Sequence, residues 1–270
     1  MKHTKMIWRT LLLPAAVGAT LTLRASVDYR IVDTRGSMLP FSVQYYDRVA
    51  AGTSSESAYA GPLTLVQNPA NNNAQLPQTL STYCLDVGGG LVAGWTYQFN
   101  VLDFAGLDGL KPKWGYAASD AGQAIQNAAK LYNAFSLGVG LPSGQQLAGT
   151  TAERAGLQLA IWESLYDTGY GGGLDVTTGG ASGAGRHFSL TGSYSGASAS
   201  AITAANNYLA QLGNISGNPT GKLLQPFAPA NYAGMPYQEV LVPEPATLIA
   251  GALMALPFGL TTARWMRRRQ

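Results

Sequence analysis

The chain has 270 residues, 11% of them charged, and a formal net charge of +3. This positive charge comes from the two ends. Between Ser26 and Val242 there are nine basic and thirteen acidic residues, so the body carries a net charge of −4. Nucleic-acid-binding proteins need clustered Lys and Arg to displace counterions, so we expect no nucleic-acid partner.

Residues 1–25 have the three parts of a secretory signal peptide. Lys2, Lys5 and Arg9 precede an apolar run from Leu11 to Leu23, and the small residue Ala25 stands at the expected cleavage site before Ser26. The alternative is an N-terminal helix of the fold, but the run lacks the amphipathic period of a surface helix. We therefore expect the protein to be exported.

From residue 28 to about residue 102 the pattern is that of short strands. Runs rich in β-branched and aromatic residues alternate with clusters of Gly, Pro and Asn. These runs are 29–32, 63–66, 82–87 and 95–102. The third contains Cys84 and stops at the glycines 88–90.

Helical spacing replaces the strand pattern between residues 119 and 214. Ser119 is a suitable N-cap for a first helix that continues to Phe135. A second helix is expected from about Thr150, which has capping-box spacing with Glu153, to about residue 167. Gln158 then lies on the shoulder of its inner face. A third helix is expected from about residue 200 to residue 212.

Residues 171–200 are rich in Gly and Ser and are expected to form a loop, and residues 237–242 a last strand. The fold class is therefore α+β, with a β-sandwich or barrel that carries a helical insertion at about 119–214. This body, residues 26–241, is long enough for one sizeable core and is expected to form a single ectodomain.

The C-terminal residues 242–270 form a tripartite tail. Pro243, Glu244 and Pro245 precede an apolar segment, 246–263, of sufficient length to span a bilayer. Four arginines follow the segment and favour the cytoplasmic side. They are Arg264, Arg267, Arg268 and Arg269. An ordinary C-terminal membrane anchor predicts the same topology.

The tail resembles the PEP-CTERM sorting signal of Gram-negative bacteria, with Pro243-Glu244-Pro245 as its motif. The resemblance implies processing by an exosortase, a membrane protease that recognises this motif. It also implies a precursor held in the inner membrane by the segment 246–263. The mature protein would then reside on the cell surface or in the extracellular matrix.

Cys84 is the only cysteine of the chain, so the protein cannot form an internal disulfide after export. A cysteine thiolate held against a glutamine carboxamide can attack it, expel ammonia and leave a γ-glutamyl thioester. Because amides are poor electrophiles, the fold must fix the pair in attack geometry and favour the thiolate.

Two motifs of the chain resemble those of the thioester domains of Gram-positive surface adhesins. They are Tyr83-Cys84-Leu85-Asp86 and Leu157-Gln158-Leu159-Ala160-Ile161-Trp162-Glu163, in the same order as in that family. The resemblance implies a Cys84–Gln158 thioester, shielded from water by Tyr83 and Trp162. It also implies covalent capture of an amine-bearing target without enzymatic turnover or cofactor. Since the sorting tail is of the Gram-negative type, the target is expected in the organism's own matrix or on a neighbouring cell.

Other readings of the sequence remain open. The main rival is a non-covalent structural or exopolysaccharide-associated surface protein in which Cys84 is a free thiol. A cysteine hydrolase would need His187 as its base, and one cysteine with one such histidine cannot build a structural zinc site. A glycosidase would need two facing acids. The available acids are Asp86, Asp103, Asp108, Glu163, Asp167 and Asp175.

Overall fold

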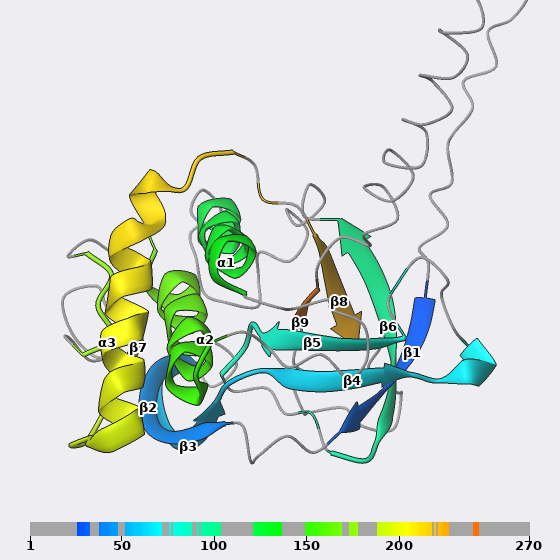
Figure 1. Cartoon of the computed structure of the whole chain (residues 1–270), viewed down its shortest axis with the longest axis horizontal. Helices are drawn as coiled ribbons and strands as arrows, with labels where there is room; N and C mark the ends of the chain where they lie inside the picture. Colours follow the sequence, from blue (N-terminus) through cyan, green and yellow to red (C-terminus); the bar gives the residue numbers. More distant parts are fainter. Residues whose placement is uncertain are drawn as a thin grey trace, which may run out of the picture.

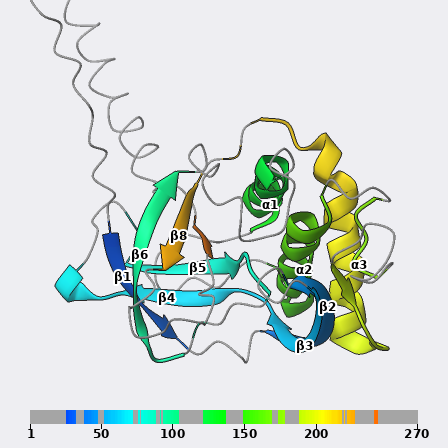
Figure 2. The same cartoon turned by 180° about the vertical axis from the view of Figure 1, so that it is seen from behind.

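The structure is a computed structural model, and it describes residues 26–32, 38–47, 52–71, 76, 78–87, 91, 93–103, 121–136, 149–168, 173–177, 188–217, 219, 221–226 and 240–242. Two parts lie side by side, a β-barrel and a lobe of three helices with a small sheet (Figure 1). The view from behind shows the same division (Figure 2).

The barrel is closed and antiparallel, in the order β1-β4-β5-β9-β8-β6. Its strands are β1 (Ser26–Val32), β4 (Leu63–Gln67), β5 (Thr79–Cys84), β6 (Thr96–Asp103), β8 (Lys222–Pro226) and β9 (Val240–Val242). Alternate residues of each strand point inward, because side chains of a strand alternate between its two faces. Val27, Tyr29 and Ile31 of β1 thus lie in the barrel core, together with Cys84.

The second part combines α1 (Ala121–Phe135), α2 (Thr151–Asp167) and α3 (Gly196–Gln211) with a three-stranded sheet. This sheet has the order β3-β2-β7, from β3 (Gly52–Ala60), β2 (Leu39–Asp47) and β7 (Phe188–Leu190). Among the described residues, short 3-10 helices are also formed at Pro69–Asn71 and Leu212–Asn214. α2 lies at the centre of this part, in contact with both other helices and with all three strands.

β5 joins the two hydrophobic cores at its C-terminal end. Leu80 and Cys84 belong to the barrel core, whereas Tyr83 and Leu85 belong to the core of the helical part. The alternation of side chains along this short segment therefore places the cysteine and its neighbours on opposite sides of the barrel wall.

The α+β class and the barrel alternative are confirmed, and the sandwich alternative is wrong. The three helices do fall between β6 and β8 of the barrel. The helical part also takes the hairpin β2–β3, which lies between β1 and β4 in the sequence. Neither strand of this hairpin is among the runs expected from the sequence.

The capping box of α2 is confirmed. The Thr150 hydroxyl accepts a hydrogen bond from the Glu153 backbone at 3.2 Å, and the Glu153 carboxylate accepts one from the Thr150 N–H at 2.6 Å. Such reciprocal bonds provide acceptors for two backbone N–H groups that have no partner within the helix at its N-terminus. They fix where α2 begins and therefore which of its residues meet the barrel.

Two expectations in the Gly/Ser-rich stretch are wrong. α3 begins at Gly196 rather than near residue 200, and Phe188–Leu190 forms strand β7 where a loop was expected. Pairing with Val43–Tyr45 of β2 stabilises β7, and Phe188 is fully buried. Tertiary contacts thus override local composition here. β8 was not expected at all, and only Val240–Val242 of the expected last strand is described as strand.

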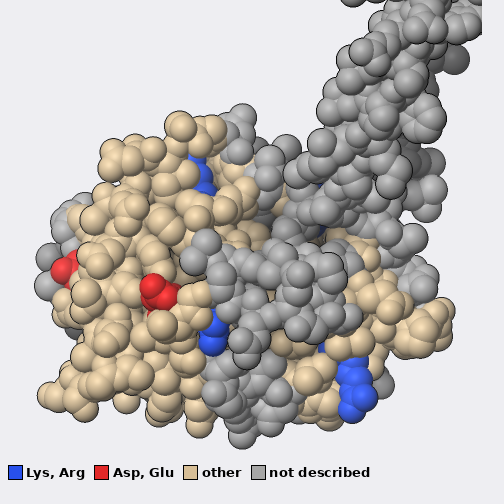
Figure 3. Space-filling model, viewed as in Figure 1, with Lys and Arg blue, Asp and Glu red and all other residues tan. Residues whose placement is uncertain are grey.

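The predicted signal peptide (1–25) and nearly all of the tail (243–270) lie outside the described residues, as does Ser119. Among the helices that are described, none combines the length and apolarity needed to cross a membrane. On the face drawn in Figure 3, the described Lys and Arg side chains are scattered rather than gathered into a patch.

Gly156 allows α2 and α3 to approach closely. A Cβ at this position would lie 2.7 Å from the Ala201 carbonyl oxygen and 2.8 Å from the Ala204 Cβ. We therefore expect Gly156→Ala to force the helices apart and to lower the free energy of unfolding by about 1–3 kcal/mol. Gly213→Ala is the control, since a Cβ there meets nothing within 4 Å. Urea unfolding of both variants tests this, and equal stabilities would contradict it.

Candidate functional site

Gln158 of α2 is hydrogen-bonded to the backbone of Cys84 at both ends of its carboxamide. The Cys84 N–H donates to Gln158 Oε1 at 3.0 Å, and Gln158 Nε2 donates to the Cys84 carbonyl oxygen at 2.7 Å. Both distances are those of well-formed hydrogen bonds. The carboxamide carbon therefore faces the Cα of the residue that bears the only thiol of the chain.

The carboxamide is completely removed from solvent. Gln158 is 0% exposed and Cys84 is 6% exposed. The expectation that Gln158 lies on the shoulder of an amphipathic helix is wrong, because every residue from Ala155 to Asp167 is buried. α2 is covered on all sides, so its polar residues must find partners inside the protein.

A second side chain of α2 binds the same stretch of chain. Tyr166 lies two turns after Gln158, and its hydroxyl donates to Asp86 Oδ1 at 2.7 Å. The same hydroxyl accepts a bond from the Val87 N–H at 3.3 Å. Gln158 and Tyr166 thus hold residues 84–87 against α2 at two points. α2 therefore contacts Cys84 itself and also the residues that follow it.

The thiol of Cys84 lies in an environment that keeps it protonated. Burial raises its pKa well above the ordinary value of 9.0, and the nearby Asp86 carboxylate raises it further. Burial and a neighbouring negative charge both disfavour the thiolate. At neutral pH the group is thus a neutral thiol, and its proton must be transferred in any reaction at the carboxamide.

The hydrogen bonds of the carboxamide bear directly on its chemistry. The N–H of Cys84 polarises the carbonyl and points at the oxygen where negative charge develops when a nucleophile adds to the carbonyl carbon. The bond from Nε2 to the carbonyl oxygen of Cys84 fixes the plane of the amide. The arrangement therefore positions an amide, and an N–H donor for its oxygen, beside the cysteine.

The two residues expected to shield the pair are both buried in the core of the helical part. Tyr83 is 1% exposed, and its ring meets that of Tyr132 edge-on with centroids 6.2 Å apart. Trp162 is 2% exposed and lies 6.2 Å from the ring of Phe188. Tyr83 thus directly precedes Cys84 in the sequence, and Trp162 lies one helical turn beyond Gln158 on α2.

The described acids are bound to neighbouring groups. Glu163 Oε1 accepts the Asp175 N–H at 2.8 Å, and Asp167 Oδ1 accepts the Phe188 N–H at 3.2 Å. Asp175 Oδ1 accepts from Thr177 and Asn206. These bonds anchor the segment before β7 to α2 and α3, and the first residue of β7 to α2. The side chain of Asp103, together with Asp108, His187 and the glycines 88–90, lies outside the described residues.

Within the described part of the chain, no group of three or more His, Cys, Asp or Glu is placed to hold a metal ion.

The sequence did not single out two residues that lie near Cys84 and Gln158, namely Tyr166 and Tyr132. Their only signal was helical spacing, Tyr166 from Gln158 and Trp162 on α2, and Tyr132 on α1.

Comparison of the chain with protein-family models, with curated proteins and with solved structures gave no match.

Proposed function

We propose that the chain is an exported surface protein whose Cys84 and Gln158 form an internal thioester that captures an amine-bearing partner. One observation carries this proposal, the two hydrogen bonds that hold the Gln158 carboxamide against the Cys84 backbone. These bonds bring the amide of Gln158 to the residue that carries the thiol, which supports a reaction between the two side chains.

Bond formation is a simple acyl transfer. Sγ of Cys84 adds to Cδ of Gln158, the C–N bond breaks, and the thiol proton leaves with the amide nitrogen as ammonia. The N–H of Cys84 stabilises the oxygen of the tetrahedral intermediate. The product then reacts with a primary amine, which forms an amide with Gln158 and returns the proton to the thiol.

The ends of the chain supply the route to the surface in this proposal. Residues 1–25 act as the signal peptide, and Pro243, Glu244 and Pro245 as the site that an exosortase recognises. The segment 246–263, with its terminal arginines, holds the precursor in the inner membrane. The ectodomain is then available on the surface or in the matrix, where the thioester contributes to adhesion or matrix attachment.

The rival function is a non-covalent surface protein with a free thiol, and one observation favours it. Burial and Asp86 raise the pKa of Cys84, which slows attack by the thiol. In this case the role of the Gln158 carboxamide is structural. It supplies hydrogen-bond partners to the backbone N–H and carbonyl of Cys84 at the end of β5. The two functions differ in a single covalent bond.

Intact mass spectrometry of the purified full-length protein distinguishes the two functions. The thioester predicts a mass about 17 Da below the sequence mass, from loss of ammonia, and a further gain of about 31 Da with methylamine. A tryptic digest should show the peptides containing Cys84 and Gln158 joined. The Cys84→Ala variant is the control and should show no deficit. A full-mass protein with one titratable thiol after unfolding would establish the rival instead.

A further inference from the structure

A polar groove lies between α1 and α3 in the helical part of the molecule. Its volume is about 640 Å³, within the range of roughly 300–1,000 Å³ that small-molecule sites in proteins occupy. Gln123, Asn127 and Lys130 of α1 line one wall. Asp175 and Asn206 of α3 line the other. The proposed function makes no use of this groove.

The wall on the α3 side is fixed by bonds to buried parts of the fold. Asn206 Oδ1 accepts the Val176 N–H at 3.2 Å, and Asn206 Nδ2 donates to Asp175 Oδ1 at 3.1 Å. The Asp175 N–H donates in turn, at 2.8 Å, to Oε1 of Glu163, which is fully buried in α2. Side chains held in this way need little further ordering when a ligand binds, which lowers the entropic cost of binding.

The opposite wall is one face of α1. Gln123, Asn127 and Lys130 are four and three residues apart, a spacing that places side chains on the same face of a helix. Asn127 Nδ2 donates to the Thr168 hydroxyl at 3.1 Å, and Asn127 Oδ1 accepts from Gln123 Nε2 at 2.8 Å. Within the described residues, the amide nitrogens of Gln123, Asn127 and Asn206 each donate one bond and keep a second N–H for a ligand.

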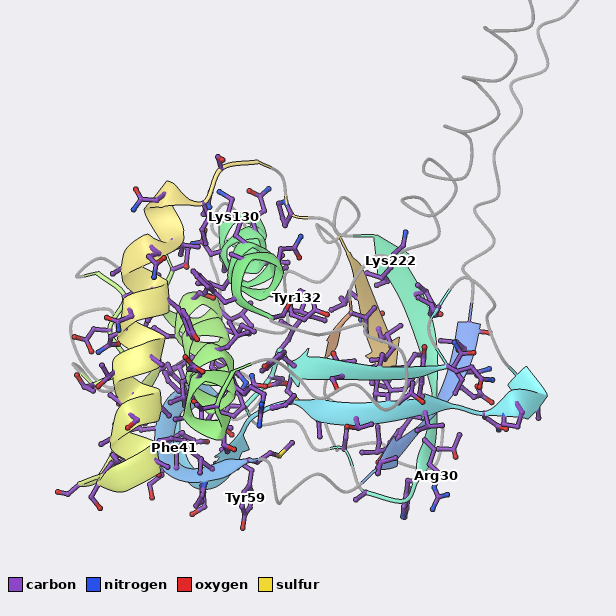
Figure 4. All side chains as sticks on the ribbon, in the orientation of Figure 1. Arg30, Phe41, Tyr59, Lys130, Tyr132 and Lys222 are labelled. Carbon is purple, nitrogen blue, oxygen red and sulfur yellow. The ribbon has the colours of Figure 1, made fainter. Side chains whose placement is uncertain are left out.

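Lys130 gives the groove a positive charge. It is partly buried, and in the described part of the chain its ammonium group has neither an ion pair nor a hydrogen bond. In Figure 4 it lies on the side of α1 that faces away from the barrel strands. The carboxylate of the opposite wall is occupied, since Asp175 Oδ1 accepts bonds from the Thr177 N–H, the Thr177 hydroxyl and Asn206. The groove therefore offers N–H donors and a cation to an anionic ligand rich in oxygen.

We infer that the groove binds a sugar acid, a hydroxyl-bearing ring that carries a carboxylate. The carboxylate pairs with the ammonium group of Lys130. The ring hydroxyls accept from the remaining amide N–H groups and donate to Gln123 Oε1. Leu174 and Leu209, which also line the groove, contact the C–H groups of the ring. Because the groove is open to solvent, it admits a free sugar acid or one residue of a polymer.

This inference goes beyond the proposed function and does not depend on it. The groove belongs to α1, α3 and the segment before β7, whereas the covalent bond of the proposed function joins α2 to β5. The Cys84→Ala variant cannot form that bond and should bind a sugar acid as wild type does. A failure of the thioester and a failure of the groove are thus separate results.

Ligand-observed NMR titrations of the full-length protein test the inference. We expect glucuronate to bind with a Kd of about 1 mM, the affinity of a ligand of about a dozen non-hydrogen atoms at ordinary efficiency. Glucose lacks the carboxylate and acetate lacks the ring, so each should bind at least about tenfold more weakly. A glucuronate trimer separates the two sources of the ligand. A Kd lower by about tenfold or more supports a polymer, and an unchanged Kd supports a free sugar acid.

Two variants locate the binding in the groove, and each has a matched control. Lys130→Gln should raise the Kd for glucuronate by about tenfold, whereas Arg30→Gln, which removes the same charge from an exposed position on the barrel, should not. Ala210→Glu adds a carboxylate to the groove at an exposed position of α3 and should raise the Kd by more than about tenfold. Asn207→Glu adds the same charge at the next, exposed residue, which does not line the groove, and should bind like wild type.

Three results would overturn the inference. The first is the absence of glucuronate binding at concentrations well above 1 mM. The second is binding that Lys130→Gln and Ala210→Glu leave unchanged, because the ligand would then lie elsewhere. The third is glucose or acetate binding as tightly as glucuronate, because the groove would then not recognise a sugar acid.

Discussion

Replacing Gln158 with Ala should destabilise the protein by about 3–5 kcal/mol even when no covalent bond can form. The measurement is made in a Cys84→Ala background, which removes the thiol and keeps the backbone groups that Gln158 binds. Without the carboxamide, the N–H and carbonyl of residue 84 lose their bonds of 3.0 and 2.7 Å inside a buried junction. The cost follows from two backbone groups that lack partners away from water.

Gln123→Ala is the matched control for this substitution. Gln123 is an exposed glutamine on α1 whose amide bonds Asn127 within the same helix at 2.8 Å. Its loss should cost less than about 0.5 kcal/mol, since such pairs contribute little in water. Chemical unfolding curves compare the two. If Gln158→Ala were as mild as Gln123→Ala, the carboxamide would not be joining the barrel to the helical part.

Gln158→Glu adds a pH dependence whose sign follows from the same geometry. A carboxylate accepts from the Cys84 N–H but cannot donate to the Cys84 carbonyl, whereas the protonated acid can do both. The folded-state pKa of the new acid is thus raised above its unfolded value of about 4.3. The stabilisation is present below that unfolded value and is lost as the pH rises through the folded pKa. The variant should therefore be most stable relative to wild type in acid.

Thioester formation should accelerate by about tenfold for each pH unit, and so about a hundredfold between pH 7 and pH 9. The reason is the raised pKa of Cys84, because the thiolate is the nucleophile and remains the minor species throughout this range. The starting material is the full-length protein recovered unfolded from inclusion bodies, in which the bond has not yet formed. The protein is refolded at each pH, and the 17 Da loss is followed over time by intact mass spectrometry.

Asp86→Asn tests the second cause of the raised pKa. Removing the carboxylate should lower the thiol pKa and speed bond formation at pH 7, by up to about tenfold. Asn keeps an oxygen that can accept from Tyr166, so the contact between residues 84–87 and α2 persists. Tyr166→Phe is the control, since it breaks this contact but leaves the carboxylate. A rate that does not vary with pH in wild type would show that thiol ionisation does not limit the reaction.

A free Cys84 thiol also changes how the free energy of unfolding depends on pH. Because the folded pKa of Cys84 is raised, the thiol contributes stability that is full below its ordinary value of 9.0 and is lost as the pH rises further. A thioester has no proton to lose and removes this contribution. Unfolding free energies of wild type and Cys84→Ala, measured between pH 8 and pH 10, should therefore run parallel if the bond is formed. They should diverge if Cys84 is free.

The sequence by itself determined the local features of this protein. The Thr150–Glu153 capping box set the start of α2, because both bonds lie within one turn of chain. Alternation and turn residues located the strands around 29–32, 63–66 and 95–102. The single cysteine, and the glutamine followed by Ala160, Ile161 and Trp162, singled out the two residues that the structure brings together.

Only the tertiary structure decided how these elements are combined. β7 and β8 are short, and their strand form depends on partners distant in the sequence, so local composition did not reveal them. The complete burial of Gln158 follows from packing on every side of α2, which a one-sided helical pattern does not predict. The raised pKa of Cys84 and the unpartnered hydroxyl of Tyr132 likewise come from what surrounds them. Burial and partners are properties of the assembled core, and no single segment carries them.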